Sequence, residues 1–162
     1  MKKLFAIVVL ALLSVAALAQ NGRDIYNKFS DEAGVSSVYI SPAMFRLIGK
    51  IPDIQMEDSN VNFSSIIKSM SGFYIISTSN MAVADELYSD VKKYINKGDF
   101  ELLMEAKEDG QVMRMYTAGN DKTVNSFIMI SKDDDEVSFI SFDGNMDRQE
   151  LENVIAEAAA DK

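Results

Sequence analysis

The chain contains neither cysteine nor histidine among its 162 residues. Without cysteine it can form no disulfide and offers no thiolate nucleophile, and without histidine it can build no Ser-His-Asp triad. The usual ligand sets of zinc and haem are excluded for the same reason. Because small exported domains often rely on disulfides, a domain of this composition has to be stabilised by packing. Hydrophobic residues make up 48% of the chain, with ten Met, nine Phe and six Tyr, which is enough for a packed core.

Residues 1–19 have the pattern of a secretory signal peptide. The pair Lys2-Lys3 precedes the apolar run LFAIVVLALLSVAALA, which ends in the small-x-small sequence that signal peptidase cuts. We expect cleavage between Ala19 and Gln20, which leaves no membrane anchor. A retained anchor is the alternative, although 16 apolar residues are slightly short for a membrane span and no basic stop-transfer flank follows them. No cysteine follows the run, so a lipid-modified N-terminus is excluded.

Residues 20–162 are expected to fold as a single domain. These 143 residues can bury roughly 68 to 70% of the surface of their unfolded chain around one core. They carry 14 Lys and Arg against 25 Asp and Glu, which gives a net charge of −11. So acidic a chain repels nucleic acid and anionic membranes, because both are bound mainly through Lys and Arg. We therefore expect a periplasmic or secreted protein that does not bind nucleic acid.

The helical spacing of apolar residues is clearest over residues 81–97. Apolar side chains recur there at i, i+4, i+8, i+11 and i+12, and Gly98 follows as a stop signal. The apolar side chains in this pattern are Val83, Leu87, Val91, Tyr94 and Ile95. Shorter helices are predicted over residues 23–33 and 147–159.

A further helix is predicted to begin at Ser41-Pro42, where a capping residue precedes proline at the first helical position. We expect three of its side chains to face the core, namely Met44, Leu47 and Ile48. Residues 50–60 contain a proline and several acidic or polar residues, which predicts an exposed connection.

Six segments predict strands, five of them because they contain β-branched and aromatic residues and residues 100–107 because apolar and charged side chains alternate there. They are residues 35–41, 73–79, 100–107, 111–117, 123–131 and 136–142. Asp109-Gly110 is a tight hairpin signal, and the last four strands are expected to form a meander. Residues 123–131 and 136–142 are apolar on both faces, which favours central positions. The predicted fold is a single α+β domain, an antiparallel sheet of five or six strands with helices packed mainly on one face.

Four stretches together resemble a known protein family. They are SPAMFRLIGKIPDIQ, VNFSSIIKSMSGFYIIST, ELLMEAKEDGQVMRMY and VSFISFDGNMDRQELENVI. In these the chain is similar to the bacterial exported domain of unknown function family 4252 (DUF4252), over nearly all of residues 20–162. The resemblance implies a small exported protein of Gram-negative bacteria, with no assigned activity and no catalytic residues to carry over. Unlike the lipidated members of that family, this chain lacks the cysteine that would carry the lipid.

Two arrangements could support hydrolysis. Ser65 and Lys68 match S-x-x-K, in which a lysine one helical turn away activates a serine, but the companion S-D-N and K-T-G elements are missing. A pair of carboxylates could serve a glycosidase, yet with 25 acidic residues such pairs arise by chance. We expect an ordinary helix surface in the first case and solvated side chains in the second.

The stretch KDDDEVSFISFDGNMDRQEL could form a calcium site, or its acidic residues could form turns and caps between structural elements. In an EF-hand register starting at Asp143, Arg148 occupies the glycine position and Val154 the position of the bidentate glutamate, so the loop is incomplete. We expect instead that Asp147 caps the closing helix in a capping box with Glu150. The run KDDDE is expected to form a hairpin turn.

These observations predict a non-enzymatic binding module of the cell envelope. No catalytic, cofactor-binding or metal-binding residue is assigned, and no cofactor is expected. The expected partner is an envelope protein or a small apolar ligand, and a metal-independent hydrolase that uses carboxylates or Ser65 and Lys68 is the alternative. Some aromatic and methionine side chains could line a ligand groove, although their alternation within strands favours core packing. They are Phe127, Met129, Phe139 and Phe142.

Overall fold

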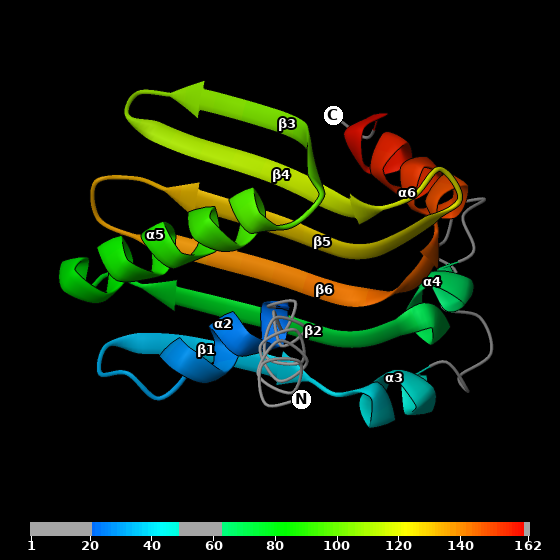
Figure 1. The fold of residues 1–162 in the computed structure, drawn as a ribbon, viewed down its shortest axis with the longest axis horizontal. Helices are drawn as coiled ribbons and strands as arrows, with labels where there is room; N and C mark the ends of the chain where they lie inside the picture. Colours follow the sequence, from blue (N-terminus) through cyan, green and yellow to red (C-terminus); the bar gives the residue numbers. More distant parts are fainter. Residues whose placement is uncertain (1–20, 49–62, 161–162) are drawn as a thin grey trace, which may run out of the picture.

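The computed structural model describes residues 21–48 and 63–160, which form one sheet of six strands with five helices (Figure 1). The helices are α2 (Gly22–Phe29), α3 (Pro42–Ile48), α4 (Phe63–Ser69), α5 (Met81–Lys97) and α6 (Arg148–Ala160). The strands are β1 (Val35–Ile40), β2 (Met70–Thr78), β3 (Phe100–Glu108), β4 (Gln111–Gly119), β5 (Thr123–Lys132) and β6 (Val137–Asp147). The connection predicted over residues 50–60 lies outside the described residues.

The strands are ordered β1-β2-β6-β5-β4-β3, and every neighbouring pair is antiparallel. Strands β3 to β6 form the predicted C-terminal meander, and β5 and β6 occupy the expected central positions. Asp109 (φ 43°) and Gly110 (φ 87°) both adopt left-handed backbone angles, as a two-residue hairpin turn requires. The α+β fold, the strand number and the meander are therefore confirmed.

Helices α2 and α5 cover one face of the sheet, as the ribbon in Figure 1 shows. Their apolar side chains meet the central strands in the main core, and burying each large one contributes about 1.5 to 3 kcal/mol. The fully buried members of this core are Phe29, Ile76, Leu87, Val91, Ile128, Val137 and Phe139. The predicted spacing of residues 81–97 supplies its α5 side, with Ala84 buried in addition.

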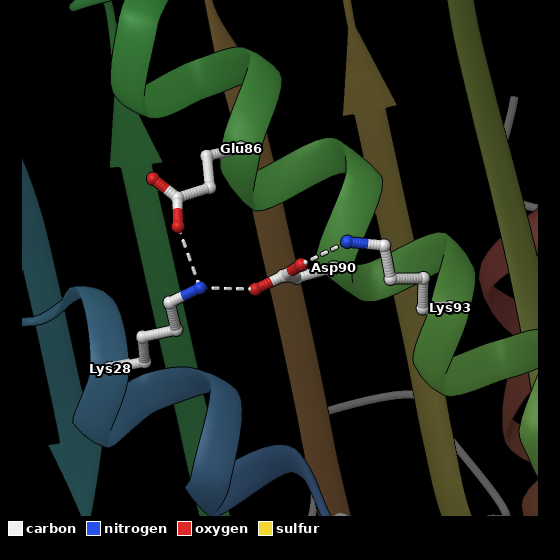
Figure 2. Close-up of polar contacts among 4 residues, drawn as sticks. All are labelled: Lys28, Glu86, Asp90 and Lys93. Atoms are coloured by element: carbon white, nitrogen blue, oxygen red, sulfur yellow. Dashed lines mark hydrogen bonds and ion pairs between the residues drawn. The ribbon is translucent and has the colours of Figure 1, made fainter.

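An ion-pair network joins α2 to α5 at the surface (Figure 2). Lys28 Nζ on α2 lies 2.7 Å from Glu86 Oε1 and 2.5 Å from Asp90 Oδ2, and Lys93 Nζ lies 3.0 Å from Asp90 Oδ1. The hydrogen bond from Lys28 is the largest cause that lowers the pKa of Asp90. Because Lys28 is 47% exposed, solvent screens these pairs and each contributes at most about 1 kcal/mol. The network orients two helices that the core already holds together.

A second, smaller core lies at one end of the sheet, where Figure 1 shows α3, α4 and α6 gathered. Ile66 of α4 and Leu151 of α6 pack there on Val124 of β5 and Met146 of β6, with Phe142 against them. Phe142 points away from α2 and α5, since its neighbour in the strand, Ser141, lies against α2. Helices α4 and α6 therefore cover one end of the second face of the sheet.

The core prediction for the helix at Pro42 is wrong for Met44 and Leu47, while Ile48 is half-buried. Met44 is 49% exposed and Leu47 is 62% exposed, whereas Phe45 is buried. Helix α3 has only seven residues and lies at the end of the sheet, so one side chain is enough to anchor it. Its apolar spacing could not show which side of so short a helix meets the sheet.

Two strands also differ from their predicted form. The simple alternation expected over residues 100–107 is broken by a register shift between Leu102 and Met104, which turns these two side chains to opposite faces. Strand β6 continues five residues beyond the predicted end, because Asp143 pairs with Ser126 and Asp147 with Thr123. The stretch in which an EF-hand was considered, residues 143–154, is thus extended strand up to Asp147 and helix from Arg148 onward, with no EF-hand loop between them.

Asp147 caps α6 as predicted. Its carboxylate oxygen accepts a hydrogen bond of 3.1 Å from the backbone N–H of Glu150, which is the first half of the expected capping box.

Asp147→Ala should lower the free energy of unfolding by about 1 kcal/mol, the usual cost of losing a cap. Urea denaturation measures this, with Asp121→Ala in an exposed turn as the control. Millimolar calcium should leave both midpoints unchanged, and saturable stabilisation lost in Asp147→Ala would show that Asp147 binds calcium.

Candidate functional site

The face of the sheet opposite α2 and α5, here called the open face, carries a row of apolar side chains across all six strands. On the covered face, Tyr39 and Tyr74 contact Tyr26 of α2, and Arg114 donates a hydrogen bond to the Tyr88 hydroxyl of α5. Their neighbours along each strand point the opposite way. Cross-strand pairing aligns these neighbours in the methionine row, which consists of Val38, Ile75, Ile140, Met129, Met115 and Met104.

Two further rows flank the methionine row. On one side, cross-strand partners form a serine row of Ser36, Ser77, Ser138 and Ser131, which Met113 and Ala106 continue. On the other side lies an aromatic row in which Phe73, Phe142 and Phe127 stack, with ring centroids 6.4 and 4.5 Å apart. Phe142 of this row also packs against the second core, so among the described residues the open face is covered at that end only.

The methionine row is accessible along its length. Val38 and Met104 at its ends are 45% and 41% exposed, and the four residues between them are half-buried. By contrast, Ile76, Ile128 and Phe139 on the covered face are fully buried. None of the six side chains of the row is charged, although a quarter of the chain is charged residues. An uncharged apolar row of this length is typical of an interaction surface.

Acidic connections lie beyond the serine row. The α2–β1, β3–β4 and β5–β6 connections lie at the same end of the sheet in Figure 1. We call this the acidic end, and it consists of Asp31, Glu32, Glu108, Asp109, Asp133, Asp134, Asp135 and Glu136. Nearby, Lys107 pairs with Glu105, and Lys132 pairs with Asp85 of α5 at 2.8 Å. A shallow hollow between the two hairpins is lined by Lys107, Glu108, Lys132 and Asp133 among others.

Glu136 ties the acidic end to the serine row. Its carboxylate accepts hydrogen bonds from the hydroxyls of Ser77 and Ser138, and the bond from Ser77 is the largest cause that lowers its pKa. The carboxylate is therefore held in its charged form at the border of the open face. The KDDDE run forms the hairpin turn expected of it, because Asp133 Oδ1 accepts the backbone N–H groups of Asp135 and Glu136.

A polar cluster lies under α2 on the covered face, and sequence reasoning missed it. Burial raises the pKa of the Asp143 carboxyl of β6, and the nearby backbone N–H of Gly22 lowers it by less. The buried Ser126 hydroxyl has no hydrogen-bond partner among the described residues. Its proximity to the Asp143 carboxyl lowers the pKa of that carboxyl, but by less than burial raises it. A Cβ at Gly22 would meet the side chain of Ser141, so glycine allows α2 to lie this close.

Two tyrosines extend this cluster. Burial raises the pKa of Tyr74 to about 12, and it raises that of Tyr94 to about 12 as well. Both phenols therefore stay neutral at physiological pH. The Ser141 hydroxyl is buried without a hydrogen-bond partner among the described residues. Burial disfavours the charged forms of Asp143, Tyr74 and Tyr94. The cluster lies beneath helices rather than on an accessible surface.

The residues considered for hydrolysis do not form a site in the described structure. Ser65 and Lys68 lie on α4, where Lys68 is exposed and Ser65 half-buried, and neither lines the hollow described above. Within the described ranges no three Asp or Glu side chains converge on a point where a metal ion could be held. Of the four aromatic and methionine residues considered for a groove, Phe139 belongs to the main core. Phe127, Met129 and Phe142 lie on the open face.

The half-buried carboxyl of Asp143 predicts an unusual pH dependence. Because the pKa of Asp143 is raised above its ordinary 3.8, the fold favours the protonated form. That contribution to stability is fully present below pH 3.8 and is lost as the pH rises through the folded-state pKa. Asp143→Asn, which stays neutral, should unfold at a higher temperature than the wild type at about pH 7, and the difference should shrink towards about pH 3.

Thermal unfolding followed by circular dichroism at both pH values measures this effect. Asp99→Asn, a change at an exposed position, is the control and should show no such pH-dependent gain. A variant Asp143→Asn that is less stable than the wild type at neutral pH would mean that the charged carboxylate is required by its neighbours.

Comparison with known proteins identifies the family. The family model described as "Domain of unknown function (DUF4252)" matches residues 26–154, which include every strand and most of the five helices. No curated protein and no solved structure matches the chain. In the described ranges no helix has the length and hydropathy needed to cross a membrane. On the strength of the family match, the chain belongs to the domain of unknown function family DUF4252.

Proposed function

We propose that the protein is an exported, non-enzymatic binding module that recognises an envelope protein or a small apolar ligand through its open face. The observation that carries this proposal is the methionine row, six uncharged side chains aligned across the sheet and accessible to solvent. Export is supported by the signal pattern of residues 1–19.

The main core does not need the open face to be apolar. A two-layer domain buries one face of its sheet under helices, and its other face is commonly polar because water covers it. Here Ile75, Ile140 and Met129 occupy positions that would be polar in a domain without a partner. Methionine is flexible and polarisable, so it suits a surface that adapts to the shape of what it binds. An apolar row kept accessible in this way favours binding over catalysis.

Capture from envelope extract tests the proposal, with two methionine variants as a matched pair. Met104 on the open face and Met81 on α5 are 41% and 43% exposed, so Met104→Glu and Met81→Glu should disturb folding to a similar, small extent. Wild type and Met81→Glu should recover the same protein or apolar compound. Met104→Glu should recover about tenfold less, because a carboxylate would be desolvated on binding.

Equal recovery by Met104→Glu and the wild type, or recovery of nothing above background, would contradict the proposal. The mass of the protein isolated from the periplasm or medium tests export separately. A chain that begins at Gln20 is expected, and a chain that keeps residues 1–19 would contradict cleavage.

A further inference from the structure

We infer that the occupant of the open face is a basic amphipathic helix of a partner protein, with its apolar side on the methionine row and its Lys and Arg towards the acidic end. This inference rests on the proposed binding function and narrows it to one kind of partner. It follows from the length of the row, from the distribution of charge around it, and from the packing of α4 and α6 on the same face.

The dimensions suit one helix. Five strand-to-strand spacings of about 4.8 Å make the methionine row about 24 Å long. A helix with a rise of 1.5 Å per residue covers this length with about 16 residues. Its diameter of about 10 Å also reaches the rows on either side. One flank of the helix would then face the serine row along its whole length.

The charge around the row differs between its two sides. Beyond the serine row stand the acidic connections, which are spread across the width of the sheet from the α2–β1 turn at one edge to the β3–β4 turn at the other. Glu136 is held at the border of the face by Ser77 and Ser138. Two basic side chains near this end, Lys107 and Lys132, are paired with Glu105 and Asp85. A helix with basic residues along one flank would therefore meet complementary charge.

Two of the chain's own helices, α4 and α6, already pack on the open face. Ile66 of α4 and Leu151 of α6 pack on Val124 and Met146, with Phe142 of the aromatic row against them. A partner helix on the methionine row would lie next to them and continue an existing layer. Its apolar side would be flanked by aromatic side chains, and its polar side by serines that can form hydrogen bonds.

A second copy of the chain fits the same surface less well. Each mature chain carries a net charge of −11, and face-to-face packing would bring two acidic ends into one assembly. The occupant should instead carry the opposite charge. A basic helix supplies it, and the binding should therefore weaken as salt screens the attraction.

A pair of synthetic peptides tests the inference. The first has about 16 residues, which forms a helix of the required length, with Leu on one side and Lys along one flank. The second has Glu in place of every Lys. Fluorescence anisotropy should show saturable binding of the Lys peptide to residues 20–162, weaker at high salt, and no binding of the Glu peptide.

Charge-reversal variants locate the contact. Asp134→Lys with Asp135→Lys changes the acidic end, while Asp99→Lys with Asp121→Lys makes the same change at exposed positions in other turns. The first pair should weaken binding of the Lys peptide by about tenfold, and the second should change it little because those charges lie farther away. Met104→Glu should also weaken it, and Met81→Glu should not.

Equal binding of the two peptides, or equal effects of the two charge-reversal pairs, would overturn the inference. So would a dimer in sedimentation that Met104→Glu dissociates, since the occupant would then be a second copy. If capture from envelope extract depends on Met104 but the Lys peptide does not bind, the binding function stands and the basic helix is wrong. If neither depends on Met104, both are wrong.

Discussion

The fold depends on one interaction, the burial of the central strands β5 and β6 under α2 and α5. Ile128 and Phe139 of these strands are fully buried against Phe29 and Leu87 of the helices. Because the chain has no cysteine and so no disulfide to add to it, this core must supply most of the free energy of folding. The polar contacts nearby, from the Lys28 network to the cluster around Asp143, orient α2 within it.

The open face follows from how β5 and β6 are built. Both strands are apolar on both sides, so placing them at the centre of the sheet turns Ile140, Met129 and Phe142 away from the helices. Helices α4 and α6 cover the aromatic end of this second face and leave the methionine row accessible. The same sequence property that fills the core thus also produces the proposed binding surface.

Local patterns predicted the elements well and their arrangement less well. The spacing of Leu87 and Val91, the turn at Asp109-Gly110 and the cap at Asp147 are local, and each was confirmed. The pairing of β2 with β6 joins segments far apart in the chain, so no local pattern shows it, and without it the methionine row cannot be recognised. Two kinds of error have the same origin. Burial of Phe45 rather than Met44, and the bulge beside Leu102, depend on neighbours that are distant in sequence.

The central claim is that one face of the sheet is sealed and the other accessible, and the methionines test it directly. Hydrogen peroxide oxidises accessible methionine to the sulfoxide, and mass spectrometry of peptides from the free mature protein gives a rate for each residue. Met104 should react about as fast as the exposed Met81, Met115 and Met129 more slowly, and the fully buried Met146 slowest of all. Met104, Met115 and Met129 reacting as slowly as Met146 would show that the open face is covered and would contradict the account.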